Sequence, residues 1–89
     1  MDKSKLDTEV NKAHRAKTLL EDPMFREAFE TLKTEYQNAL LATKHNEDEQ
    51  RKALWLAWHL TDKIEQHFKT AVETGKLAQA QLNELKHNG

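Results

Sequence analysis

Histidine is the side chain in this 89-residue sequence best suited to bind a metal or to carry a proton. Two of the histidines lie in the most apolar segment, His59 and His67. They are eight residues apart, so a helix places them near one face but two turns from each other, too far to chelate one ion. We therefore interpret both as surface histidines and expect no metal site. The others are His14, His45 and His87.

Nucleophilic chemistry has few candidates. Ser4 is the single serine, it lies where a helix would begin, and the sequence has no cysteine. The familiar pairs of a nucleophile and a base are therefore missing. Gly75 and Gly89 are too few and too far apart for a phosphate-binding loop. We expect no catalytic residues, no cofactor and no enzyme activity.

Three consecutive carboxylates, Glu47, Asp48 and Glu49, are the remaining candidate for a metal site. A calcium loop needs a glycine and alternating ligands, which this segment lacks. Carboxylates stabilise the first turn of a helix, and Asn46 is a good residue to cap it. Acid-before-base pairs four residues apart, such as Glu47 with Arg51, support the same helix. This cluster therefore predicts a helix start.

The elements that position these residues are helices. Glycine and proline are scarce, with 2 and 1 residues, and charged residues make up 33% of the chain. The segment with the highest density of apolar residues is 51–68, which is apolar around more than half of its circumference when drawn as a helix. Such a helix needs cover on more than one side. Its main stripe consists of Leu54, Ala57, Leu60, Ile64 and Phe68.

Local signals divide the chain into four helical segments of one domain, residues 1–89. Ser4 is predicted to cap the first, residues 4–21, because Asp7 follows it at capping-box spacing. Asp22-Pro23 ends that helix and begins the next, residues 23–43. The central helix is predicted over residues 47–74, with Gly75 as its left-handed C-terminal cap. A short helix, residues 76–86, ends the chain.

The three-residue turn at residues 44–46 forces the two longest helices to run antiparallel. The predicted fold is thus all-α, an antiparallel helical hairpin with additional N- and C-terminal segments. Phe25 is expected near Phe68, and Tyr36 near Leu56 or Leu60. The facing stripes are predicted to be Phe25, Phe29, Leu32 and Tyr36 on one helix and Leu54, Leu60, Ile64 and Phe68 on the other.

Trp55 and Trp58 flank the central stripe and need further cover. The hypothesis is that the protein is a homodimer, a helical bundle in which these tryptophans line the interface with Asp62 and Lys63 near its rim. A wild-type protein that stays monomeric at high concentration would contradict it.

Partner classes follow from charge and hydropathy. The net charge is −1, which provides no general attraction for nucleic acid or an anionic membrane. The longest apolar run is residues 53–58, well short of the roughly 20 residues of a membrane span. We therefore expect no membrane contact, and a cytoplasmic protein. The alternative is a small nucleic-acid-binding or regulatory protein that uses Lys5, Lys12 and Arg15; salt-sensitive retention of DNA would favour it.

Three motifs carry a resemblance to a known group: LLEDPMFREAF (residues 19–29), RKALWLAWHL (residues 51–60) and VETGKLAQAQL (residues 72–82). Together they resemble small all-helical proteins of tailed bacteriophages and prophages, encoded near head and DNA-packaging genes. The motifs are helix caps, core positions and a helix stop, so the resemblance implies no functional residues. Trp58 and His59 depart from the group's pattern.

The resemblance implies a non-enzymatic interaction protein that presents a rigid helical surface to head or packaging proteins. It would act in the bacterial cytoplasm or as part of the virion. A toxin-neutralising or host-takeover protein is a third possibility.

Overall fold

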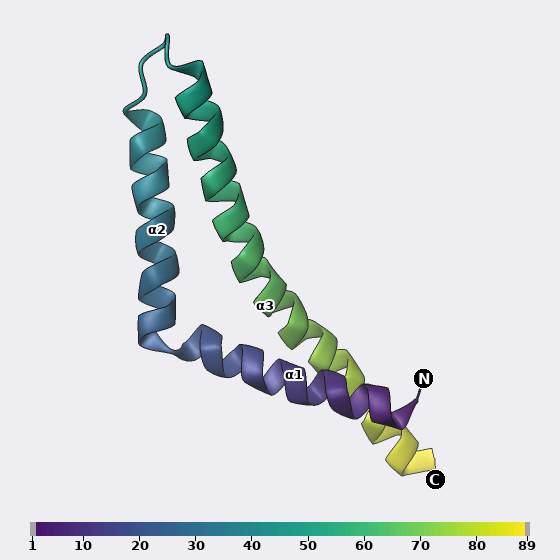
Figure 1. Ribbon diagram of the computed structural model, residues 1–89. Coiled ribbons are helices and arrows are strands. Elements are labelled where there is room, and N and C mark those ends of the chain that lie inside the picture. The colour runs from purple at the N-terminus through teal and green to yellow at the C-terminus, as the bar shows by residue number, and fades with distance from the viewer. Residues whose placement is uncertain (1, 89) are drawn as a thin grey trace. The chain divides into compact units, whose positions relative to one another are not determined.

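The computed structural model describes residues 2–88, and every regular element in this range is a helix (Figure 1). The helices are α1 (Lys3–Glu21), α2 (Pro23–Leu41) and α3 (Asp48–Asn88). The all-α prediction is confirmed. The single domain stays a prediction. The described residues form two compact units, one of residues 2–22 with residues 67–88 and one of residues 23–66. Each unit is described by itself.

The boundary between α1 and α2 follows the predicted chemistry. Asp22 takes an extended conformation, as the residue before a proline does, and α2 begins at Pro23. The other end of α1 corrects the prediction that Ser4 is the cap. The cap is Asp2, whose carboxylate accepts a hydrogen bond from the Ser4 backbone N–H at 3.3 Å. A cap two residues earlier lengthens the helix by about half a turn.

The turn between α2 and α3 is longer than predicted, because α2 ends at Leu41 and α3 begins at Asp48. Asn46 therefore lies in the turn and does not precede the helix. Glu47 occupies that position, and its carboxylate accepts a hydrogen bond from the Lys44 N–H at 2.8 Å. Arg51 forms its ion pair with Asp48, at 2.7 Å and a spacing of three residues, and not with Glu47.

Arg51 is also the side chain that joins the two ends of the turn. Its Nε donates to the Thr43 hydroxyl at 3.1 Å, and its Nη2 donates to the Lys44 carbonyl. These contacts connect the residues after α2 to the first turn of α3. The Arg51 guanidinium therefore stabilises the turn between α2 and α3.

Within residues 23–66, α2 and the first part of α3 form the predicted antiparallel hairpin (Figure 1). Lys33 defines the register, because its Nζ lies 3.0 Å from Glu65 and 3.7 Å from Asp62. Only 26% of the Lys33 side chain and 15% of the Glu65 side chain is exposed. The hydrogen bond to Glu65 raises the Lys33 pKa above its ordinary value, and it outweighs the opposing effect of burial.

The face that α3 turns toward α2 differs from the predicted one. Leu60 and Ile64 are 51% and 52% exposed, so they lie outside the contact. The Lys33 ion pairs place Asp62 and Glu65 on the α2 side, and this rotates the predicted stripe away. Leu32 is likewise 39% exposed. The half-buried residues of α3 in the hairpin include Leu54, Ala57, Trp58 and Thr61.

No described residue of α2 is fully buried, so the hairpin has a thin core. Phe29, predicted to be buried, is half-buried, and so is Phe68 in the other unit. The predicted pairing of Phe25 with Phe68 joins the two units and stays a prediction.

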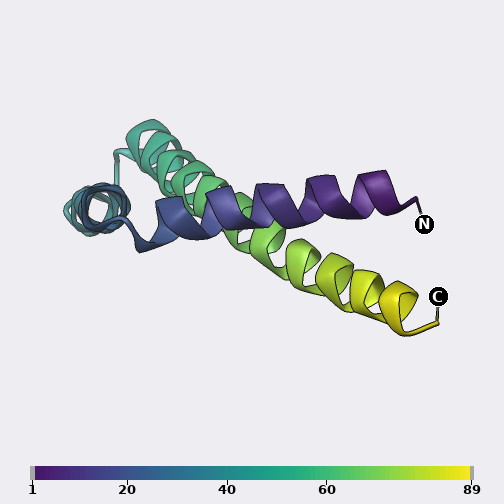
Figure 2. The same cartoon turned by 90° about the horizontal axis from the view of Figure 1, so that it is seen from below.

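The best-buried side chains lie in the unit of residues 2–22 and 67–88. Leu6, Ala78 and Leu82 form a cluster with exposed fractions of 2%, 4% and 7%, and Val10 packs against it. The cluster joins α1 to the second half of α3, and the start of α1 and the end of α3 lie toward the same side of the view (Figure 2). Leu6 and Val10 of α1 therefore pack against apolar residues of α3.

Gly75 lies within α3 and does not end it. The helix is unbroken from Asp48 to Asn88, and no described glycine has a positive φ. The predicted helix end at residue 74 is therefore wrong. Gly75 is buried against α1: a Cβ there would overlap the Ala13 Cβ and lie 3.2 Å from the Glu9 carbonyl oxygen. This glycine allows close approach of two helices.

Candidate interaction surface

The side of α3 that faces away from α2 carries a line of apolar residues, Ala53, Leu56, Leu60 and Ile64. We call this line the outer strip. All four residues are exposed, and the three larger ones keep 51–52% of their surface accessible. Their spacing of three, four and four residues holds them on one face of a helix. The structure therefore presents a hydrophobic stripe with no cover from the hairpin.

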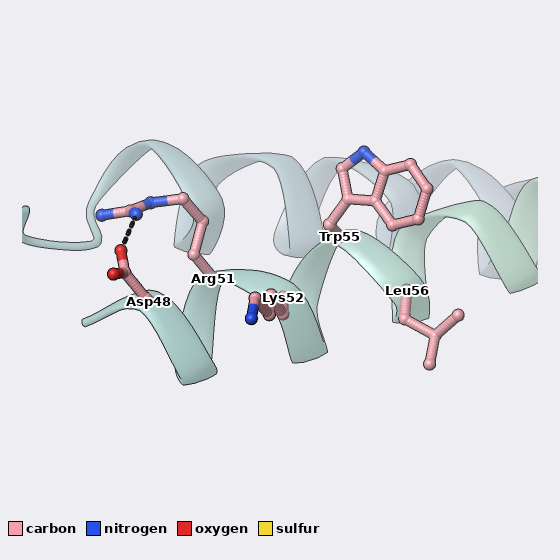
Figure 3. A pocket seen from close by; sticks show the side chains of 5 residues that line it. All are labelled: Asp48, Arg51, Lys52, Trp55 and Leu56. Atoms are coloured by element: carbon pink, nitrogen blue, oxygen red, sulfur yellow. Dashed lines mark hydrogen bonds and ion pairs between the residues drawn. The ribbon is translucent and has the colours of Figure 1, made fainter.

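The strip is distinct from the side that meets the turn. Figure 3 shows the Leu56 side chain leaving α3 away from the Trp55 indole, with Arg51 on the indole's side. Leu56 is 52% exposed although α2 packs against another side of α3. Because the Leu56 side chain points away from Arg51, the strip is separate from the contacts that Arg51 makes with the turn.

Charged residues occupy both ends of the strip. Glu49 and Lys63 lie seven residues before and after Leu56, so all three fall almost on one line, drifting by about 20° per seven residues. Glu49 is 94% exposed and forms a loose ion pair with Lys52 at 3.8 Å. Lys63 is exposed, and no ion pair is found for it among residues 2–88. The strip therefore begins beside the Glu49–Lys52 pair and has Lys63 near its other end.

Trp55, Trp58 and His59 form an aromatic cluster beside the strip. The His59 ring lies 3.8 Å from the Trp55 ring and 4.7 Å from the Trp58 ring, measured between centroids. Trp55 remains 52% exposed, whereas Trp58 is half-buried. The imidazole thus contacts both indoles.

A shallow hollow of about 530 Å³ adjoins this cluster. The residues that line it all belong to α3 and include both apolar and charged side chains (Figure 3). Such a depression suits the side chain of a protein partner better than a small molecule, which needs enclosure on several sides. The lining residues are Asp48, Arg51, Lys52, Trp55 and Leu56.

The residues predicted for self-association have separate positions. Trp55 and Lys63 are exposed, while Trp58 lies on the half-buried side of α3. Asp62 pairs with Lys33 of α2 at 3.7 Å, so its carboxylate serves the hairpin and not an outer rim. The proposed role of these four residues in a dimer stays a prediction.

The alternative nucleic-acid contact also stays a prediction. Lys5, Lys12 and Arg15 are all exposed on α1. Asp7 is exposed and Glu9 half-buried on the same helix, which dilutes the positive charge.

Metal ligands are not gathered anywhere in residues 2–88: no group of three or more histidine, aspartate or glutamate side chains could hold an ion. One Glu-x-x-His pattern, Glu84 with His87, lies near the end of α3. It lacks further ligands in the described structure. No helix within the described residues combines the length and hydropathy needed to cross a bilayer.

Comparison with known proteins adds no relative. No protein-family model, curated protein or solved structure matches the chain.

The outer strip itself was not predicted as a surface. Leu60 and Ile64 were assigned to the hairpin contact, and Leu56 was expected near Tyr36. The four-residue steps from Leu56 to Leu60 and Ile64 were the available signal. They marked a second apolar face, which the breadth of the apolar segment required.

Proposed function

We propose that this protein is a non-enzymatic helical interaction protein and that the outer strip of α3 is its binding surface. The observation that carries the proposal is the half-exposure of Leu56, Leu60 and Ile64 at helical spacing, opposite the α2 contact. Apolar side chains that repeat at this spacing are the usual anchors of helix-mediated recognition. Continuous exposed apolar surface of this kind marks a protein contact.

The hairpin gives this surface a rigid support. Arg51 closes the turn, and Lys33 fixes the register of α2 against α3 with a short hydrogen bond to Glu65. Anchors on a packed helix lose little conformational entropy when they bind. The strip can therefore act as a pre-formed docking edge.

The resemblance to small phage-encoded proteins supports a place for this surface in head assembly or DNA packaging. On this proposal the protein acts in the bacterial cytoplasm, or in the virion, by docking on a larger protein or on itself. Its action is binding alone.

A photo-crosslinking amino acid at position 60 tests the proposal in the native host. We expect discrete cross-linked products from position 60, and none from the matched exposed position 30 on α2. Excess wild-type protein should compete these products away, whereas the Leu56→Glu variant should not. The same weak products from positions 60 and 30 would refute a specific surface.

A further inference from the structure

We infer that the outer strip binds the outer strip of a second copy, with the two α3 helices antiparallel and a two-fold axis passing close to Leu56. This inference rests on the proposed function and names the partner of the same surface. It follows from the order of charges along the strip and from the sizes of the residues around Leu56.

The charges of the strip complement themselves in one orientation only. Residues 49 and 63 lie about 10.5 Å on either side of Leu56 along the helix. Antiparallel pairing about Leu56 therefore places Glu49 of each copy level with Lys63 of the other, which gives two symmetric ion pairs. Parallel pairing in register would place Glu49 on Glu49, Lys52 on Lys52 and Lys63 on Lys63, which costs energy at each level.

The ends of the strip are free to make these pairs. Glu49 is 94% exposed and its contact with Lys52 is 3.8 Å long, so little is lost when it rearranges. Lys63 has no ion pair within residues 2–88. Lys52 lies level with Leu60 of the second copy, where its aliphatic stem covers apolar surface while its ammonium group reaches water.

Residue sizes agree with the same axis. Leu56 meets Leu56 at the centre. Leu60 lies four residues after the centre and Ala53 three residues before it, so the large side chain of one copy is level with the small side chain of the other. Both lie on the same side of Leu56 around the helix, about 40° and 60° from it at 100° per residue. A two-fold axis perpendicular to the helix pair keeps them on that side, so Leu60 packs over Ala53 twice.

The residues of the strip are separate from those that hold the hairpin. Asp62 and Lys33 remain paired on the α2 side, and Arg51 keeps its contacts with the turn. A net charge of −1 opposes the meeting of two copies only weakly. The contact is short, about 21 Å along each helix from residue 49 to residue 63, so we expect a reversible dimer on the order of 10 µM.

Site-specific disulfide formation tests the orientation directly, because the sequence has no cysteine. Under mild oxidation, a mixture of Glu49→Cys and Lys63→Cys chains should form a disulfide-linked heterodimer. Each variant alone should remain uncross-linked. The mixed dimer keeps one Glu49–Lys63 ion pair at its other end. Efficient self-cross-linking of each variant alone would show parallel pairing and overturn the inference.

Sedimentation equilibrium of charge-reversal variants tests the energetics. Glu49→Lys or Lys63→Glu should weaken association about 10-fold, and the double variant should return to within about threefold of wild type. The double variant still carries Glu49→Lys, so any damage to the start of α3 is present in it as well. Recovery of its association would therefore show that the single variants lose affinity through the lost ion pair. Glu30→Lys, with the same charge change on α2, should leave association unchanged.

Two outcomes separate this inference from the proposed function. A protein that stays monomeric at several hundred micromolar, roughly 10-fold or more above the expected dissociation constant, refutes self-pairing. If position 60 still cross-links specifically to a different protein, the binding surface stands and its partner is not a second copy. If position 60 gives no specific product either, both proposals fail.

Discussion

Replacement of Gly75 by alanine adds one methyl group, which has two opposite effects on stability: it favours the helix but crowds the packing against α1. Alanine is favoured over glycine inside a helix by about 1 kcal/mol. Gly75 lies in the middle of α3, so this term alone predicts a more stable protein. The structure predicts the opposite, because the space for the methyl group is already filled by α1.

The packing cost follows from the atoms that a Cβ at position 75 meets. It would overlap the Ala13 Cβ and lie 3.2 Å from the Glu9 carbonyl oxygen and 3.4 Å from the Ala13 Cα. None of these atoms can rotate away, because each is backbone or the first atom of a side chain. The helices must separate, and overpacking of this kind costs about 2–3 kcal/mol. The net loss for Gly75→Ala is therefore about 1–2 kcal/mol.

Thermal and urea unfolding followed by circular dichroism measures this loss. For a chain of this size, each 1 kcal/mol lowers Tm by about 4–8 °C. Ala13→Gly in the same chain removes the overlapping methyl group and should restore part of the loss, a coupling that a double-mutant cycle isolates. Ala80→Gly is the matched control, since Ala80 is exposed five residues later in α3 and should report propensity alone, about 1 kcal/mol. A Gly75→Ala variant more stable than wild type would refute the close contact of α1 with α3.

Two further predictions concern the hairpin. Lys33→Met should destabilise the protein by about 1 kcal/mol at neutral pH. Because the folded pKa of Lys33 is raised above 10.5, its contribution to stability is complete below that pH and is lost as the pH rises through the folded value. The unfolding curves of wild type and variant should therefore converge at alkaline pH, and a constant difference would contradict the ion pair. Asn46→Ala should change stability by less than about 0.5 kcal/mol, as a surface substitution does. Arg51→Ala should cost about 1–2 kcal/mol, because it removes the contacts with Thr43, Lys44 and Asp48. Equal effects of the two substitutions in urea unfolding would refute this account of the turn.

Local signals predicted the helix boundaries that depend on backbone chemistry. Asp22-Pro23 marked a break because proline disfavours the helical region for the residue before it, a steric effect that acts within the local backbone. Asn46 failed as a cap because Glu47 and Arg51 hold a longer turn through side-chain contacts. Such contacts depend on where α2 ends, which the sequence near residue 46 does not specify.

Gly75 shows a different limit. A glycine near a change of pattern suits a left-handed helix cap, but it equally suits close approach of a second backbone. The choice depends on Ala13, which lies 62 positions earlier in the chain and contacts it only after folding. Periodicity within α3 carries no information about that contact.

The rotation of α3 against α2 was also beyond pattern analysis. An apolar segment that covers more than half of a helix offers several faces for a partner helix, and hydrophobic burial alone barely distinguishes them. Lys33 selects among them, because its ion pairs with Glu65 and Asp62 require those carboxylates on the α2 side. Leu56, Leu60 and Ile64 consequently face outward. A polar contact of the hairpin thereby determines which apolar residues form the candidate surface.

The size of that surface sets what it can do. Complete burial of a leucine or isoleucine is favourable by about 1.5–3 kcal/mol, so burying the remaining half of Leu56, Leu60 and Ile64 gives about 1 kcal/mol each, or about 6 kcal/mol for two copies. Apolar burial on this scale supports a weak, reversible contact, and the Glu49–Lys63 pairs decide the orientation more than the affinity. A weak contact of this kind depends on the local concentration of the protein, and its overall affinity rises when many copies are held side by side on a larger assembly.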